Sequence, residues 1–317
     1  MPFGVRALRV EDLTLIGLAA MKSSTADGVA AELAAAVGRT GAPRAIVSDD
    51  GADLNGAVAR FRRTHPGTAH VHDAAHRGAN ILKNRWGKDA RWAAFVGGMT
   101  RTAPRIRQTP EAYLLPPMPR TKARFMNVGP LLRFAGRVLG LPGESPAGSR
   151  TRERYGWLEE YRGAVAGWRD EYEVVQAAVR RIRTDGVERG SVAAVEAEWA
   201  GMGLAAGGDV AARTRAMVRE AGALAGPEET LVGSTEVLES AFGKLKRVEG
   251  SQAGGGFTGL ALSLGAMMSG REEGAVREAL EAVPRKEAEG WARRLFGPTI
   301  QWFRGLFLRG EPVPDPG

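Results

Sequence analysis

Short apolar runs alternate with amphipathic segments over the N-terminal part of this chain, and this alternation constrains the fold more than any other feature. The three runs of strand length cover residues 13–18, 45–48 and 68–72. The segments with helical spacing cover residues 25–40, 54–63 and 77–86. Strands that alternate with helices indicate a largely parallel α/β core. Such a core places functional groups at the carboxyl ends of its strands.

Asp49 is the first candidate for chemistry, because it directly follows the apolar run 45–48. A carboxylate at a strand end is held in position and can bind a divalent cation. Asp50 and Asp53 lie close in sequence, but we expect them to point elsewhere. The sequence Asp-Asp-Gly after a strand is also a common turn, so both interpretations remain open.

A second candidate pair, Asp73 and His76, follows the run 68–72. Three residues apart at the start of a helix, the two side chains can face one cleft. Asn80 lies one helical turn beyond His76. Alternatively, His76 caps the following helix or bonds a buried carbonyl group.

A third pair, Glu239 and Lys246, lies on a predicted helix that begins after Ser234 and ends near Gly250. Residues seven positions apart share one face of a helix. Both lie off the apolar stripe, so the helix presents a carboxylate and an amine together. An ordinary solvated surface would have the same pattern.

The middle of the chain has a different character. Residues 91–150 are basic and rich in proline, so we expect no long regular element at their start, whereas residues 151–225 have helical patterning. Apolar residues there are spaced by three and four, at Leu158, Tyr161, Val165, Trp168, Tyr172, Val175, Val179 and Ile182. This stripe predicts a long helix, ended by Gly186, that packs within its own chain or forms a coiled-coil dimer.

The charge of the chain is concentrated rather than spread. The net charge is +8, while residues 80–140 alone hold twelve Lys or Arg and two acids, a net charge of +10. A basic block of this kind is typical of a protein with a polyanionic partner, above all nucleic acid, although a solvated surface is the plain alternative.

The absence of cysteine and of long apolar runs excludes several classes of protein. Without cysteine there are no disulfides or thiolate metal sites, so a metal would be held by oxygen or imidazole, as suits Mg²⁺ or Mn²⁺. No apolar run is long enough for a membrane span. We therefore expect a cytoplasmic protein. With nucleic acid as the expected partner, it would be nucleoid-associated.

Four stretches in order resemble the DDE transposases of bacterial insertion sequences. They are AIVSDDGADLNGAVARF, HVHDAAHRGANILK, PPMPRTKARFMN and STEVLESAFGKLKR followed by GGGFTGLAL. The resemblance implies an α/β fold with a ribonuclease H-like mixed sheet core, incomplete at the N-terminus and interrupted by a mainly helical insertion. The implied parts are residues 1–90 (first part of the core), 91–230 (basic helical insertion), 231–310 (rest of the core) and 311–317 (disordered tail).

The resemblance also implies roles for individual residues. Asp49 and Glu239 match catalytic carboxylates that hold Mg²⁺ or Mn²⁺ in a two-metal site for DNA strand cleavage and transfer. Asp73, His76 and Lys246 match supporting positions. The implied DNA-binding residues are Lys83, Arg85, Arg120, Lys122, Arg124 and Lys244. The implied partner is double-stranded DNA, bound by a homodimer or a larger assembly.

One part of the family pattern is missing. The first catalytic Asp lies on the first strand in such enzymes, whereas residues 13–18 match the third strand and only residues 1–12 precede them. We therefore expect a truncated, weakly active or inactive copy. The alternatives are a non-catalytic DNA-binding remnant and a helical oligomerisation or scaffold protein. A hydrolase that uses Ser48 or His76 is disfavoured, because the chain has no G-x-S-x-G motif.

Overall fold

The computed structural model describes most of the chain up to residue 238 and parts of the remainder. The described ranges are 16–17, 24–110, 112–119, 124–141, 146–204, 206–238 and 273–282, with single residues between 240 and 312. The chain has two compact units. The first consists of residues 1–7, 45–51 and 69–234, and the second of residues 8–44, 52–68 and 235–317.

The structure is mostly helical, and the predicted ribonuclease H-like fold is wrong. The described residues are mostly helical, and their strands form one sheet of two parallel strands. These are β1 (Ala45–Ser48) and β2 (Ala69–His72), paired in register from Ala45 opposite Ala69 to Ser48 opposite His72. Strand-like runs were predicted from local pattern alone, and local pattern does not show how many strands a sheet contains.

The run 13–18, predicted as a further strand, is described only at Ile16 and Gly17. Neither residue belongs to a strand. The neighbouring prediction for residues 25–40 is confirmed, because α1 covers Ala26–Thr40. It begins where Thr25 Oγ1 accepts a hydrogen bond from Gly28 N at 3.1 Å.

The second unit pairs α1 with α2 (Ala52–Thr64), and α12 (Glu273–Ala282) belongs to the same unit. Gly56 lets the two helices approach closely, since a Cβ built there would lie 3.0 Å from Ala26 Cβ. Arg60 Nε lies 3.1 Å from Asp27 Oδ1, which adds an exposed ion pair between the helices.

The first unit begins with the two strands and α3 (Ala74–Trp86), followed by α4 (Ala90–Ile106) and α5 (Gly129–Leu139). The expectation of no long element after residue 91 is wrong. Asp89 caps α4 by accepting from Arg91 N, and an apolar stripe that includes Phe95 and Met99 is fully buried. Pro104 lies inside α4 near its end and has no N–H, so the helix lacks the backbone hydrogen bond from residue 104 to the carbonyl of Thr100.

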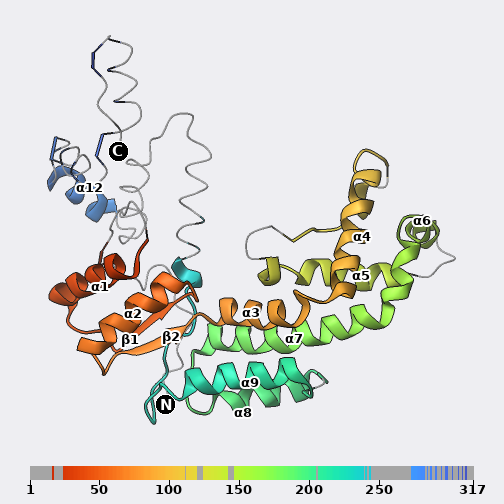
Figure 1. Ribbon diagram of the computed structural model, residues 1–317, viewed down its shortest axis with the longest axis horizontal. Coiled ribbons are helices and arrows are strands. Elements are labelled where there is room, and N and C mark those ends of the chain that lie inside the picture. Colours follow the sequence, from red (N-terminus) through yellow and green to blue (C-terminus); the bar gives the residue numbers. More distant parts are fainter. Residues whose placement is uncertain are drawn as a thin grey trace. The chain divides into compact units, whose positions relative to one another are not determined.

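The long helix predicted from the apolar stripe is confirmed as α7 (Arg162–Asp185), preceded by α6 (Pro146–Tyr155) and a 3₁₀ segment (Gly156–Tyr161). All eight residues of the stripe are buried within this single chain. Helix α7 contacts α3, α5, α8 (Ser191–Gly201) and α9 (Asp209–Gly222), as Figure 1 shows for α3 and α9. The stripe therefore packs within its own chain.

Aromatic side chains form the centre of this core. The indoles of Trp92 and Trp168 meet edge to face with centroids 4.9 Å apart, and Trp86 lies 4.9 Å from Trp92. The Trp86 indole Nε1 donates a hydrogen bond to Glu171 Oε2, so its buried polar atom is paired. This cluster ties α3 and α4 to α7.

Helix α7 ends at Gly186, whose φ of 77° suits glycine. The next residue, Val187, forms an antiparallel bridge with Leu231, so the end of α7 is anchored to residues close to the end of the first unit. Among the described helices, none combines the length and apolar character that a bilayer crossing needs.

Candidate functional site at the strand ends

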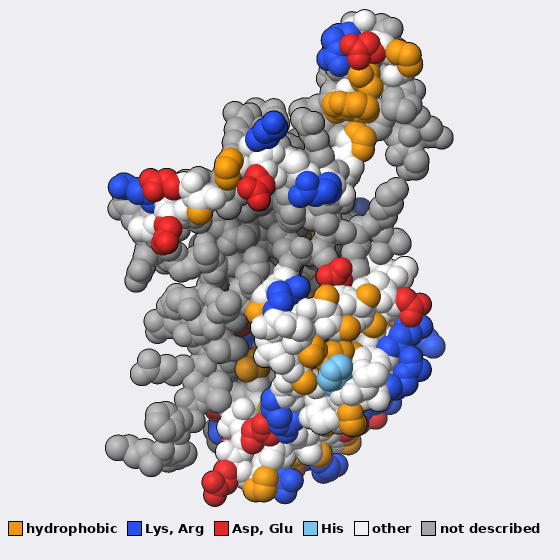
Figure 2. All heavy atoms as spheres, turned by 90° about the vertical axis from the view of Figure 1, so that its left-hand side faces the viewer, with side chains coloured by type: hydrophobic (Ala, Val, Ile, Leu, Met, Phe, Trp, Pro, Cys, Tyr) orange, Lys and Arg blue, Asp and Glu red, His pale blue; other side chains and the backbone are white. Residues whose placement is uncertain are grey.

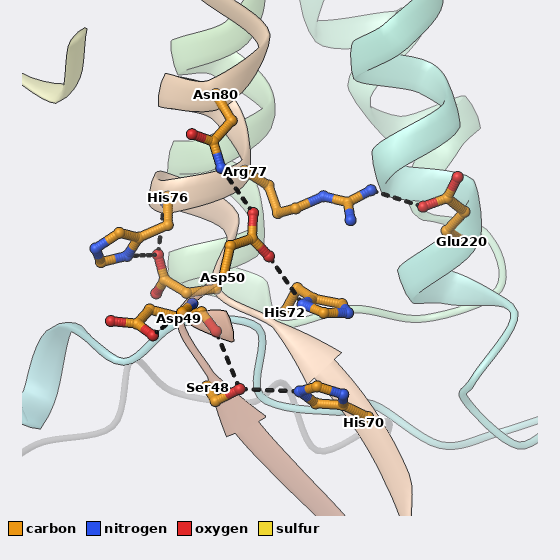
Figure 3. Close-up of polar contacts among 11 residues, drawn as sticks. Ser48, Asp49, Asp50, His70, His72, His76, Arg77, Asn80 and Glu220 are labelled. Atoms are coloured by element: carbon orange, nitrogen blue, oxygen red, sulfur yellow. Dashed lines mark hydrogen bonds and ion pairs between the residues drawn. The ribbon is translucent and has the colours of Figure 1, made fainter. Parts of the chain in front are cut away.

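The carboxyl ends of β1 and β2 lie side by side because the strands are parallel and in register (Figure 3). The chain is held there by a hydrogen bond from Asp73 N to Ser48 O at 2.8 Å. Two segments far apart in sequence, residues 48–50 and 70–80, thus contribute polar side chains to one place. This arrangement agrees with the placement predicted for Asp49 and Asp73.

Asp49 is half-buried and forms a local turn. Its Oδ1 accepts a hydrogen bond from Gly51 N at 3.1 Å. The other carboxylate oxygen takes no part in this contact. Asp49 therefore stands at the strand end, as predicted, and also has the ordinary turn role that was its alternative.

Asp50 points into the cluster, although the sequence suggested that it would point away. Its Oδ2 accepts a hydrogen bond from Asn80 Nδ2 at 2.8 Å, and its Oδ1 lies 2.9 Å from His72 Nδ1 (Figure 3). The His72 contact has ion-pair distance, but Nδ1 is buried without a well-directed hydrogen bond. Asp50, which follows β1, thus links the end of that strand to His72 on β2 and Asn80 on α3.

Asp73 and His76 lie together, as predicted, but Asp73 has a structural role. Its side chain is 2% exposed, and its Oδ1 accepts from His76 N at 2.8 Å and lies 2.9 Å from His76 Nδ1. Asp73, rather than His76, is the N-cap of α3. This explains why the two residues stand three positions apart.

Two histidines of β2 belong to the site and were not singled out from the sequence. Ser48 Oγ and His70 Nε2 are 2.9 Å apart, and the rings of His70 and His72 have centroids separated by 4.3 Å. The signal was present, because residues i and i+2 of a strand share one face. Two histidines at that spacing on β2 had to lie together.

A charge pair from α3 and α9 completes the cluster. Arg77 Nη2 donates to Glu220 Oε2 at 2.7 Å, although the two residues are 143 positions apart in the chain (Figure 3). No local pattern links Arg77 to Glu220, so this pair could not be found from the sequence.

The described residues do not form a metal site. No group of three or more His, Asp or Glu side chains within the described ranges could hold a metal ion. Asp73 is committed to its cap, and Glu239 lies outside the described residues, as do Lys246, Lys244, Arg120 and Lys122. The Mg²⁺ or Mn²⁺ expected from the resemblance therefore has no cluster of ligands among the described residues.

The structure describes three of the predicted DNA-binding residues. One of them, Arg85, already has a carboxylate partner. Lys83 and Arg85 are exposed near the end of α3, but Arg85 Nε donates to Glu171 Oε1 at 3.0 Å. Arg124 is exposed in a short 3₁₀ segment (Arg124–Met126). Arg85 is thus already partnered within the fold.

Helices α4 and α5 each present two exposed arginines separated by four residues. The pairs are Arg101 with Arg105, and Arg133 with Arg137. Residues 90–141 contain nine Lys or Arg and one acid, Glu111. Among the described residues, no carboxylate forms an ion pair with these four arginines. By contrast, the face in Figure 2 shows Lys and Arg side chains mixed with Asp and Glu.

Comparison of the chain with protein-family models, with curated proteins and with solved structures finds no match in any of the three.

Proposed function

We propose that this chain is a transposase-related protein that binds double-stranded DNA through the exposed arginines of α4 and α5. The observation that carries the proposal is the repeat of exposed arginines one helical turn apart on both helices. The order of four transposase-like sequence stretches supports the same class of partner.

Like charges four residues apart on a helix repel each other and destabilise it by about 0.2–0.5 kcal/mol per pair. Neither Arg101 with Arg105 nor Arg133 with Arg137 has an acid of the described residues to relieve this repulsion. Phosphate groups would relieve it, because a guanidinium group matches the geometry of phosphate oxygens. Contacts of this kind bind the DNA backbone largely without regard to base sequence.

The direct test measures DNA affinity over a series of salt concentrations. Substitution of Arg101, Arg105, Arg133 and Arg137 by Gln should lower affinity and flatten the salt dependence. Each lost phosphate contact reduces the slope of log K against log salt by about 0.9. As the matched control, Arg180→Gln and Arg213→Gln remove exposed arginines that are paired with Glu173 and Asp209.

Unchanged affinity and slope in the fourfold variant would refute this proposal. A stable oligomer without DNA affinity would instead support the scaffold alternative. Light scattering on the same samples separates these outcomes.

The catalytic part of the resemblance, with Asp49 and Glu239 as carboxylates for Mg²⁺ or Mn²⁺, stays a prediction. Its test is cleavage of duplex DNA with Mn²⁺ by the full chain, compared with Asp49→Asn and Glu239→Ala. Metal-dependent cleavage that persists in both variants would exclude these residues. DNA binding without cleavage would identify the chain as the non-catalytic alternative.

A further inference from the structure

A pocket of about 220 Å³ lies beside β2 in the first unit, between the strand and helices α3, α7 and α9. One part of its lining is polar and the other is aliphatic. None of the four arginines proposed to bind DNA lines this pocket.

The polar part carries opposite charges next to each other. Arg77 Nη2 and Glu220 Oε2 are 2.7 Å apart, and their side chains are 32% and 66% exposed. Both residues line the pocket, so its polar part offers a cation and an anion within hydrogen-bond distance of each other. Exposed ion pairs contribute little net stability, so a ligand that bonds both groups can separate them at small cost.

The rings of His70 and His72 line the same part of the pocket in a fixed arrangement. Ser48 Oγ lies 2.9 Å from His70 Nε2, and Asp50 Oδ1 lies 2.9 Å from His72 Nδ1 (Figure 3). Ser48 of β1 therefore holds the His70 ring, and Asp50 lies at ion-pair distance from the His72 ring; both contacts reduce the ordering that ligand binding would require.

The aliphatic part is shielded from water. Ile182, Val187 and Met217 line the pocket and are no more than 5% exposed, and Leu224 lines it beside them. These branched and flexible side chains offer an apolar wall without the flat aromatic faces that stack on a nucleobase. The wall suits an aliphatic group.

Size and charge together restrict the ligand. A pocket of about 220 Å³ is smaller than the roughly 300–1,000 Å³ typical of sites for drug-sized molecules. A zwitterion places a carboxylate and an ammonium group on one carbon atom, which matches the adjacent Arg77 and Glu220. An aliphatic side chain on that carbon would lie against the wall of Ile182 and Met217.

We propose that this pocket binds a free α-amino acid with an aliphatic side chain. The ligand's carboxylate accepts hydrogen bonds from Arg77, and its ammonium group donates to Glu220. The side chain enters the aliphatic part of the pocket, where burial of apolar surface favours binding.

The test uses calorimetry and thermal shift on the full chain, with L-leucine and L-methionine as probes. Three comparison compounds each lack one feature: 4-methylpentanoate has no ammonium group, 3-methylbutylamine has no carboxylate, and glycine has no apolar side chain. We expect L-leucine or L-methionine to bind and the three comparison compounds to bind roughly tenfold or more weakly. Guanosine is included as the nucleobase probe.

Three variants locate the binding. Arg77→Gln and Glu220→Gln should each weaken L-leucine binding roughly tenfold or more. Ala221→Leu keeps all charges and should abolish binding by filling the pocket. Arg213→Gln, on the same helix and paired with Asp209, should leave affinity unchanged.

The ligand series on the unmodified chain decides the question even if a variant fails to fold. Absence of binding by both amino acids, or tighter binding of guanosine, would overturn the proposal. Loss of amino-acid binding in Arg213→Gln but not in Ala221→Leu would place the ligand elsewhere and also overturn it.

Discussion

Asp73 and His76 are joined twice. The Asp73 Oδ1 atom accepts a hydrogen bond from His76 N at 2.8 Å and lies 2.9 Å from His76 Nδ1. The spacing of three residues between them is the spacing of a helix N-cap. One carboxylate oxygen thus begins α3 and orients the imidazole.

Replacement of Asp73 by Ala should destabilise the protein. The change removes the cap of α3 from a residue that is 2% exposed, and loss of such a cap costs about 0.5–2 kcal/mol. Asp73→Asn keeps an acceptor oxygen and should lose less. Urea unfolding measures both, and an Ala variant as stable as the Asn variant would contradict the capping role.

Replacement of the adjacent α4 residues Gly97 and Gly98 by alanine should change the stability of the protein in opposite directions. A Cβ at Gly98 would lie 2.5 Å from Trp157 Cη2, so Gly98→Ala must displace a ring and should cost about 1–3 kcal/mol. A Cβ at Gly97 would meet only the flexible guanidinium of Arg101, at 3.2 Å. Gly97→Ala should therefore stabilise the helix, by up to about 1 kcal/mol.

Thermal unfolding of the two single variants provides the comparison. Each serves as the control for the other, because both carry the same change in helix propensity. Equal shifts in their melting temperatures would show that Trp157 does not restrict Gly98.

Arg85 and Arg101 should contribute unequally to DNA binding. Arg85 is held by Glu171, whereas no carboxylate among the described residues pairs with Arg101. We expect Arg101→Gln to lower DNA affinity and its salt dependence more than Arg85→Gln does. Competition binding at two salt concentrations measures the difference, and a larger loss with Arg85→Gln would contradict the assignment.

The buried Tyr155 should reduce stability at alkaline pH. Its hydroxyl donates to Leu114 O at 2.6 Å, and burial raises its pKa from 10.0 to about 12. Below pH 10 the phenol is neutral in both folded and unfolded chains. Above pH 10 the unfolded chain loses this proton first, so stability falls as pH rises from 10 to about 12, by roughly 2 kcal/mol.

Tyr155→Phe should remove this part of the pH dependence. At neutral pH the variant should lose about 1 kcal/mol, because Leu114 O loses its hydrogen-bond partner. Urea unfolding at pH 8 and above pH 10 measures both effects. Burial also raises the pKa of Tyr172, so the stability of the Tyr155→Phe variant should still fall somewhat with rising pH above 10. An unchanged slope in Tyr155→Phe would contradict the assignment to Tyr155.

The local elements were predicted well where one face of an element is apolar. The positions of α1, β1, α2, β2 and α3 follow the predicted segments closely, and the stripe from Leu158 to Ile182 is buried as expected. Helix α4 was missed, because the proline and basic residues between 91 and 110 suggested irregular structure. The apolar positions Phe95 and Met99 outweighed them, since their burial favours the helix.

The candidate site was predicted in part. Asp49, Asp73 and His76 lie at the strand ends as expected, but the sequence did not indicate that Asp73 was committed to a cap. It also gave no sign of Arg77 with Glu220, because the partners of exposed charges depend on which helices meet. Glu239 and Lys246 lie outside the described residues, so their proposed roles stay predictions.

The sequence by itself determined where α1, β1, α2, β2 and α3 lie, that α7 has one buried face, and that the basic charge is concentrated between residues 80 and 140. Those properties depend on neighbours within a few positions of each other. Tertiary structure decided that the described sheet has two strands, that Asp50 meets His72 and Asn80, and that Arg77 pairs with Glu220. These contacts join residues up to 143 positions apart, and only packing of the helices against one another brings such residues together.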